Sequence, residues 1–487
     1  MRAHLRRVGA ISAMLWLSGC VSGPDYRVPA TAMAVAPDAQ GRFASSGPPT
    51  YTQAEPPDHW WQMYQDAQLE AYVAEALRAN TDLRAADANL RRASAVVLEH
   101  QAQGTLRTDT AASGTLAHAG GYTLPSGSLP QAYALGITLS YPLDLAGGIR
   151  RGIEAASADA EAVAAARDQV RVTAVAAAVT RAYVGACSAN QTLAATQRVL
   201  STQRDTLDAT RRLAAGGRGT EFDVIRASAA VNRSAAAVPQ LIAERQRAVA
   251  ELGALMGRVP SHYPQEVSAC ARPPRLDRPL PVGNGWQLIQ RRPDIRAAER
   301  RLAAATAAIG VETAELYPQV NLGASAGIAN APRRLLASES VGASVGPLLS
   351  WRWPNRRAVK ARIAAANARA EAALASFDGA VVQALQQTDT ALSTYSQALD
   401  REASLARARE DAAHASAQAG QLYRFGRIGF IDVLSAEAAL ADAESALASS
   451  QAQLIDRQVD LFLALGGGWS PSGPGGDAEA EAAQRAP

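Results

Sequence analysis

The spacing of apolar residues along this chain changes from a helical period to a strict alternation and back, and it does so twice. The alternating segments lie at about 105–143 and about 317–353. Apolar residues there alternate with small or polar ones: Tyr133, Leu135, Ile137, Leu139, Tyr141 and Leu143 in the first, and Val320, Leu322, Ala324, Ala326, Ile328, Val341, Ala343, Val345, Leu349, Trp351 and Trp353 in the second. The remaining strand, near Leu106 to Leu116, alternates less well, and Pro347 interrupts the fourth. The pattern predicts two β-hairpins, with loops at 120–130 and 330–340.

Each predicted hairpin is followed by a long helical pattern, at about 147–215 and about 356–424. At 1.5 Å per residue each helix would be roughly 100 Å long. The second contains a coiled-coil seam of residues mostly three or four positions apart: Leu374, Phe377, Val381, Leu385, Thr388, Leu392, Tyr395 and Leu399. Shorter helices are predicted at about 82–104 and, after a turn at 216–219, at about 220–256.

The two halves of the chain resemble each other in sequence. Seven residues recur 209 positions later as the same or a similar residue: Leu213, Gly217, Arg218, Asp223, Val224, Ile225 and Gly257 become Leu422, Gly426, Arg427, Asp432, Val433, Leu434 and Gly466. The segment from Thr81 to Asp87 likewise recurs as Pro293 to Glu299. We therefore predict an internal duplication, with repeats at 67–257 and 285–466. The linker at 258–284 contains six prolines and cannot form a regular helix.

The two faces of the predicted strands suit a membrane β-barrel with a watery lumen, although strands of a soluble sandwich alternate similarly. In a barrel the apolar and aromatic set would face lipid: Tyr133, Leu135, Ile137, Leu139, Tyr141, Trp351 and Trp353. Thr138 and Ser140 would face the lumen. Four strands cannot close a barrel, because the smallest membrane barrels have about eight. The protomer must therefore form an oligomer, and long helices below a shared barrel predict a conduit.

The amino terminus has the features of a bacterial lipoprotein signal peptide. Residues 1–19 hold three arginines and an apolar run that is too short to span a bilayer. Leu17-Ser18-Gly19 then precedes Cys20, the predicted site of lipid attachment. The alternative is a chance cysteine after an ordinary signal peptide. Val21, where an aspartate would signal retention at the inner membrane, resembles the sorting signal of Gram-negative outer-membrane lipoproteins.

Charge and cysteine content narrow the function classes. The chain has 48 Lys and Arg against 45 Asp and Glu, and the leader holds three arginines, so the mature chain is formally neutral. This balance does not suggest a nucleic-acid partner. With Cys20 acylated, only Cys187 and Cys270 remain, and the sequence leaves open whether they pair.

Motifs of catalytic or metal sites are missing from the sequence. The six histidines show no ligand spacing, and no Gly-x-Ser-x-Gly or Ser-x-x-Lys motif stands out. The segment Gly216-Gly217-Arg218-Gly219 lacks the preceding strand and the following Lys-Ser/Thr of a phosphate loop, which favours a turn between helices. We expect no enzymatic activity, no cofactor and no metal.

Several motifs, in order along the chain, resemble the NodT-type efflux lipoproteins, which are outer-membrane factors of the TolC superfamily. They are Cys20-Val21-Ser22-Gly23-Pro24-Asp25-Tyr26 with Pro29, Trp60-Trp61 with Asp66 and Leu69, Asn80 with Asp82, and Arg292-Pro293-Asp294-Ile295 to Ala298-Glu299 with Tyr317-Pro318. The resemblance implies a mainly α fold with a membrane β-barrel portion. Long coiled helices would form an α-barrel tunnel, and four strands per protomer would enter a trimeric, twelve-stranded barrel. The resemblance also implies a lipid-anchored proline-rich arm (20–66), a linker in an equatorial collar (258–284) and a disordered tail (467–487).

The resemblance also implies partners and a gate. The partners are two further copies, a periplasmic adaptor, an inner-membrane pump of the resistance-nodulation-division class, and outer-membrane lipid through Cys20. The gate would lie at the periplasmic tip, where the long helices turn back. The candidate residues there are Gly217, Arg218, Glu221, Asp223, Tyr423, Arg424, Gly426, Arg427 and Asp432. The alternative is that these are solvated helix ends, where exposed ion pairs contribute only about 0 to 1 kcal/mol.

We therefore expect the outer-membrane channel of a tripartite efflux system in a Gram-negative bacterium, exporting small molecules to the exterior. Two other functions remain open at this stage. One is the outer-membrane conduit of a type I secretion system, and the other is a structural envelope lipoprotein without a pore. Conductance in planar bilayers would separate the last from a channel.

Overall fold

The computed structural model describes residues 21–467, apart from Pro48, 117–130, Asp277, 331–339, Arg352 and Asn355. The predicted signal peptide, Cys20, most of both hairpin loops and nearly all of the tail lie outside the described residues. The chain forms two compact units. The first unit contains Asn89–Ala164, Ala297–Phe377 and the described residues up to Ala32. The second contains Met33–Ala88, Ala165–Arg296 and the described residues from Asp378 on.

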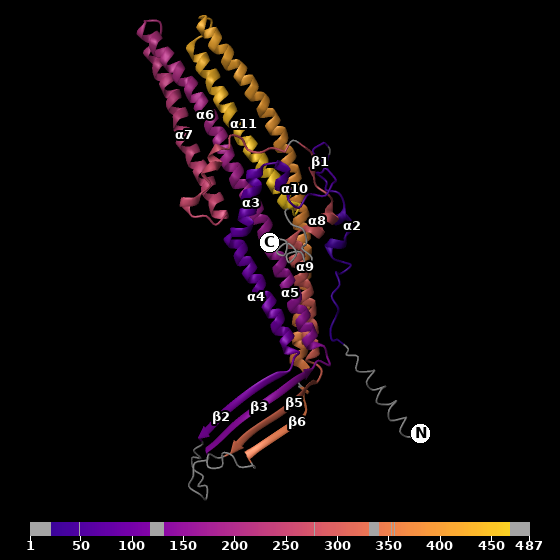
Figure 1. The fold of residues 1–487 in the computed structure, drawn as a ribbon. Coiled ribbons are helices and arrows are strands. Elements are labelled where there is room, and N and C mark those ends of the chain that lie inside the picture. Colours follow the sequence, from indigo (N-terminus) through magenta and orange to yellow (C-terminus); the bar gives the residue numbers. More distant parts are fainter. Residues whose placement is uncertain are drawn as a thin grey trace, which may run out of the picture. The chain divides into compact units, whose positions relative to one another are not determined.

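The first unit holds a four-stranded antiparallel sheet in the order β2-β3-β5-β6 (Figure 1). The strands are β2 (Arg107–Leu116), β3 (Gln131–Leu143), β5 (Gln319–Asn330) and β6 (Val341–Ser350). They lie within the two segments where the alternating pattern predicted hairpins. The central pair, β3 and β5, comes from different halves of the chain.

Helices of this unit precede and follow the strands. They are most of α4 (Thr81–Gln103), of α5 (Gly148–Val170) and of α9 (Pro293–Ala314), and the first part of α10 (Arg356–Arg424). The order helix, two strands, long helix, helix occurs once in each half of the chain. The predicted helices at 82–104 and 356–424 are confirmed within a residue or two.

The second unit contains two antiparallel helix pairs, α6 (Ala178–Ala215) with α7 (Glu221–Leu255), and the rest of α10 with α11 (Phe430–Ala464) (Figure 1). Members of the predicted seam on α10 are buried: Phe377, Val381, Thr388, Leu392 and Tyr395. Small residues of α6, such as Ala182 and Ala186, are also buried, which permits close helix packing.

The predicted long helix at about 147–215 is confirmed as a continuous helical stretch, Gly148–Ala215, although it is not α-helical throughout. A π-helical stretch, η3 (Arg171–Ala177), separates α5 from α6. Within it the Thr173 hydroxyl donates to the Gln169 carbonyl at 2.8 Å, a contact that competes with the regular backbone ladder. Among the described residues one helical stretch, Gly148–Ala215, is long and apolar enough to cross a membrane, and 69% of its most apolar window is buried, as in a core helix.

The proline-rich arm folds into short elements instead of running as extended chain. It contains η1 (Met33–Val35), α2 (Pro37–Gln40), β1 (Tyr51–Thr52) and η2 (Trp60–Tyr64), and it leads into α3 (Ala67–Ala79). The physical reason is aromatic burial. Trp60 is 0% exposed and stacks on Phe462 of α11, with ring centroids 5.0 Å apart. The Asp66 carboxylate caps α3 by accepting from the backbone N–H groups of Gln68 and Leu69.

The linker at 258–284 contains no α-helix among its described residues, as its prolines predicted. It has η4 (Pro260–His262), η5 (Gln265–Ala269) and β4 (Leu280–Pro281), which pairs in parallel with β1 of the arm. Cys270 of the linker forms a disulfide with Cys187 of α6. The short helix α8 (Gly285–Arg291) follows the linker and leads into α9. The linker is thus tied to both the helices and the arm of the second unit.

Candidate functional site

The two turns between the paired helices have the same backbone geometry. Gly217 ends the first turn with φ +69° and Gly426 the second with φ +68°, values in the left-handed region that favour glycine. The N–H of the following residue reaches back to the last helical turn: Arg218 donates to Leu213 O at 2.9 Å, and Arg427 to Leu422 O at 2.9 Å. These bonds satisfy carbonyls that would otherwise be left open at the helix ends. The repeated glycines therefore have a definite structural role.

The carboxylates that follow the glycines cap the returning helices. Asp223 and Thr220 form a reciprocal capping box, with Thr220 Oγ1 donating to Asp223 Oδ2 at 2.6 Å. In the second turn Asp432 Oδ2 accepts from the Gly429 N–H at 3.0 Å. Neither carboxylate, nor that of the exposed Glu221, forms an ion pair with an arginine in the described part of the chain. Within the described residues, Asp223 and Asp432 therefore act as helix caps.

Tyr423 packs into an apolar cluster that joins the two turns. Its ring lies 5.7 Å from that of Phe430, and the cluster also includes Leu207 of α6 and Ala227 of α7. Burial raises the pKa of the Tyr423 phenol, and the nearby Asp223 carboxylate raises it further. The phenol is therefore neutral at physiological pH. Within one chain, Tyr423 holds the helix pairs together by packing.

The arginines of the turns are exposed and lack carboxylate partners within the described residues. Arg424 Nε donates only to Gly420 O of its own helix, at 3.2 Å. Arg218 and Arg427 are also exposed. Apolar side chains lie beside them, with Phe425 79% exposed. The turns thus present cations and aromatic rings to their surroundings.

The strand register gathers the expected lipid-facing residues of β3 on one face of the sheet. Ile137 pairs with Thr110 of β2 and Ala326 of β5, and cross-strand partners point to the same face. The same register adds residues from β5 and β6 to this face: Val320, Leu322, Ala324, Ala326, Ile328, Val341, Ala343, Val345 and Leu349. Val345 is 87% exposed. Just after β6, Trp351 and Trp353 stack with ring centroids 5.2 Å apart.

The opposite face is small and mostly polar. Thr138 pairs with Asp109 and Ser325, and the Ser325 and Ser344 hydroxyls are 2.8 Å apart. Leu348 is an apolar exception on this face. A sheet with one apolar and one polar face fits the boundary between lipid and water.

The arm just after Cys20 is clamped to the helices of the first unit by Arg151, which sequence reasoning missed. The Arg151 side chain is only 4% exposed. It donates to Ser22 O at 3.0 Å, to Gly23 O at 3.2 Å and to the Asp25 carboxylate at 2.7 Å. Gly23, with φ +84°, lies so close to Gly310 of α9 that an added Cβ would come within 2.5 Å of the Gly310 Cα. The residues Gly23 and Asp25 stood out in the sequence, but nothing marked their partners.

The Arg292-Pro293-Asp294 motif has a structural role. The Arg292 guanidinium donates to Ala464 O at the end of α11 and to Gln387 of α10, and it forms an ion pair with Asp294 at 2.6 Å. It thereby joins three helices of the second unit. Within the described residues, no group of three or more His, Cys, Asp or Glu side chains is placed to hold a metal.

Comparison with known proteins finds similarity over nearly the whole chain. A model of the family described as "Outer membrane efflux protein" matches residues 72–258 and 286–467. Nodulation protein T of Rhizobium leguminosarum bv. trifolii is 27% identical over 462 residues, which cover 94% of this chain and 96% of that protein. The solvent efflux pump outer membrane protein SrpC of Pseudomonas putida is 28% identical over 472 residues, covering 94% of this chain and 98% of that protein. Among solved structures, the outer-membrane channel OprN superposes with a TM-score of 0.84 and 34% identity over 93% of this chain and 100% of that chain.

Proposed function

Because the chain belongs to the outer membrane efflux protein family, we propose a specific form for its role as an outer-membrane efflux channel, in which three copies assemble into one conduit. Each copy contributes its four strands to a shared barrel of twelve, and its long helices to an α-helical tunnel. The observation that carries this proposal is the described sheet, which has one apolar face and ends in two edge strands, β2 and β6. An open edge is not viable in lipid, and pairing β2 of one copy with β6 of the next removes both edges.

The partners follow from the same role. We assign to the channel a periplasmic adaptor and an inner-membrane pump of the resistance-nodulation-division class, which together export small molecules from the periplasm or cytoplasm. The description of SrpC as the outer membrane protein of a solvent efflux pump supports a pump partner. The separate family matches to the two halves support an internal duplication, with repeats at 67–257 and 285–466.

The same proposal includes a lipid anchor at Cys20. The Arg151 clamp supports it, because the clamp fixes the backbone from Ser22 to Asp25 and leaves only a short tether to the acylated residue. Mass spectrometry of the mature amino-terminal peptide tests the anchor. We expect a cleaved, acylated Cys20, and an unmodified cysteine or cleavage elsewhere would refute it.

We place the gate at the two helix turns. Their arginines have no carboxylate partner in the described chain, so they are available to a neighbouring copy. In this proposal Arg218, Arg424 and Arg427 act between copies, Tyr423 holds the two turns of one copy together, and Gly217 and Gly426 shape the turns. Glu221 offers a carboxylate that is not used as a cap. Several such contacts around a threefold axis would bias a two-state closure.

The direct test of the conduit is conductance of the purified protein in planar bilayers, together with its mass by light scattering after detergent correction. We expect a trimer that forms discrete conducting events. A trimer that never conducts, even after voltage is applied, would favour a structural envelope lipoprotein. A monomer that inserts into membranes would contradict the shared barrel.

A further inference from the structure

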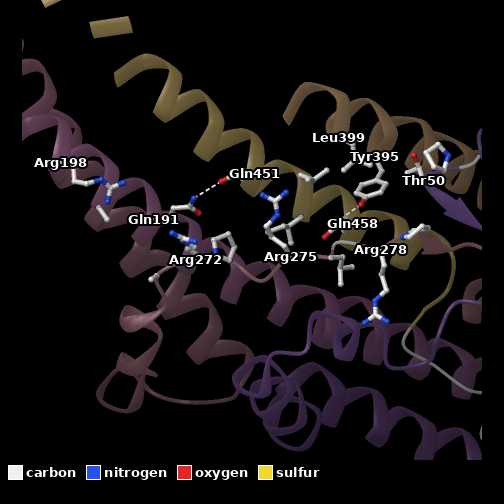
Figure 2. Close-up of a pocket in the computed structure, with 18 residues that line it drawn as sticks. Thr50, Gln191, Arg198, Arg272, Arg275, Arg278, Tyr395, Leu399, Gln451 and Gln458 are labelled. Atoms are coloured by element: carbon white, nitrogen blue, oxygen red, sulfur yellow. Dashed lines mark hydrogen bonds between the residues drawn. The ribbon is translucent and has the colours of Figure 1, made fainter. Parts of the chain in front are cut away.

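A cavity of about 800 Å³ lies within the second unit, between α6, α10, α11 and residues 271–279 of the linker (Figure 2). None of the described lining residues is an aspartate or a glutamate. The lining does contain four arginines: Arg198, Arg272, Arg275 and Arg278. Arginine stays charged at every physiological pH. The described part of the lining is therefore cationic.

Two of these four cations have no partner within the described chain. Arg275 forms an ion pair with Glu402 at 3.1 Å, and Arg278 Nη2 lies 3.5 Å from Met63 O. The side chains of Arg198 and Arg272 form no ion pair or hydrogen bond with any described residue. Figure 2 shows Arg198, Arg272 and Arg275 gathered around the Gln191–Gln451 pair. Among the described residues, no carboxylate pairs with Arg198 or Arg272.

The described residues of the arginine-bearing segment, 271–276 with 278 and 279, lie between two fixed points of the backbone. Immediately before it, the Cys187–Cys270 disulfide ties the linker to α6, and Asn190 Nδ2 donates to Cys270 O at 3.0 Å. Immediately after it, Leu280 N–H donates to Thr50 O at 3.0 Å where β4 pairs with β1. Three prolines within the segment restrict its backbone further: Pro273, Pro274 and Pro279. The backbone that carries Arg272, Arg275 and Arg278 is therefore restricted, which lowers the backbone entropy lost when a ligand binds.

The rest of the lining is rigid and amphipathic. Gln458 donates to Tyr395 Oη at 3.1 Å (Figure 2). It also accepts from Tyr64 Oη at 3.0 Å, so its amide is fixed. Apolar side chains complete the lining, including Leu399, Leu454 and Ile455. Sites of this volume, with a few oriented polar groups on apolar walls, are typical of small-molecule binding.

We propose that this cavity binds a small organic anion that carries at least two carboxylate or phosphate groups. Guanidinium groups bind either oxyanion through paired N–H donors, and the spare charge of Arg198 and Arg272 supplies the main contacts. None of these arginines belongs to the two helix turns at which the gate is placed.

Isothermal titration of the detergent-solubilised full-length protein at low ionic strength tests the proposal, with citrate and with pyrophosphate as probes. We expect saturable binding of at least one probe, at one site per chain. Tighter binding of citrate assigns the site to carboxylates, and tighter binding of pyrophosphate assigns it to phosphates. Arg198→Gln or Arg272→Gln should each weaken binding roughly threefold or more, and the double variant roughly tenfold or more.

The matched control is Arg233→Gln, which removes an exposed arginine of α7 that does not line the cavity. It should bind the probes as tightly as the wild-type protein. Absence of saturable binding for both probes would overturn the proposal. So would equal weakening by Arg233→Gln, because the effect would then reflect net charge alone. The double variant should keep wild-type conductance. Loss of anion binding can therefore be distinguished from failure of the conduit proposal.

Discussion

Loss of the Cys187–Cys270 disulfide should lower the stability of the second unit substantially. The two cysteines are 83 residues apart in sequence, so the bond closes a long loop in the unfolded chain. On the chain-entropy model a loop of that length corresponds to about 4.5 kcal/mol of stabilisation at 25 °C. Residual structure in the unfolded state reduces this value, so it is an upper figure.

The perturbation is the double substitution Cys187→Ala with Cys270→Ser. Alanine suits position 187 because that side chain is fully buried, and a serine hydroxyl there would need a hydrogen-bond partner. We expect the melting midpoint, followed by circular dichroism at the helical band, to fall by about 5 to 10 °C. Wild-type protein treated with a reducing agent should melt at a similarly lowered temperature.

The double variant also serves as the control for the reducing agent, because it has no disulfide to lose. Its midpoint should be the same with and without reductant. If oxidised and reduced wild-type protein melt at the same temperature, the loop-closure argument is wrong.

Three further outcomes follow from the strands, the turns and a buried carboxylate. Ile137→Arg should prevent membrane assembly, since an arginine facing lipid costs about 2 to 4 kcal/mol at mid-bilayer, whereas Thr138→Arg should assemble normally. The heat-dependent gel mobility of each variant in outer-membrane fractions measures assembly, and the reverse result would show that the two faces of the sheet are misassigned. Arg424→Ala should raise single-channel conductance at rest more than Tyr423→Phe, because the phenylalanine keeps the aromatic ring that packs. If the channels of both variants stay as tightly closed as the wild-type channel, the gate does not lie at the turns. Burial raises the pKa of Glu437, one of whose oxygens has no hydrogen-bond partner, so the folded state binds this proton more tightly than the unfolded state does. Stability should therefore fall as pH rises above the usual glutamate pKa of 4.5. Glu437→Gln should stabilise the protein at pH 7 by about 1 kcal/mol and flatten this pH dependence. If the free energy of unfolding, measured in urea, depends on pH in the same way in the variant, the assignment is wrong.

The elements of this fold were largely predictable, because each depends on a short pattern. The strands fall within the alternating segments, and α10 covers the predicted stretch at 356–424. One helical segment was not predictable from such a pattern. The π-helical stretch at Arg171–Ala177 lies inside a sequence with an ordinary helical period, so the pattern gave no sign of it.

The candidate site was predictable only in part. The repeated glycines at 217 and 426 marked both turns, since a left-handed residue is needed there. The sequence pattern did not show what the residues next to these glycines do. Asp223 caps its own helix, and the Thr220-x-x-Asp223 spacing is the sequence signal for this cap. The cationic cavity had a weaker signal, three arginines spaced three apart among prolines.

The sequence by itself determined where helices, strands and turns lie and which face of each strand is apolar, because periodicity and backbone requirements are encoded by neighbouring residues. Only the tertiary structure decided which distant groups meet. Arg151 lies in an alanine-rich helix like many other arginines, yet it is buried against backbone oxygens about 130 residues earlier in the chain. Cys187 and Cys270 pair because the linker returns to α6, a path that no local pattern specifies. Contacts of this kind depend on the packing of the whole chain, so they become visible only when the fold is known.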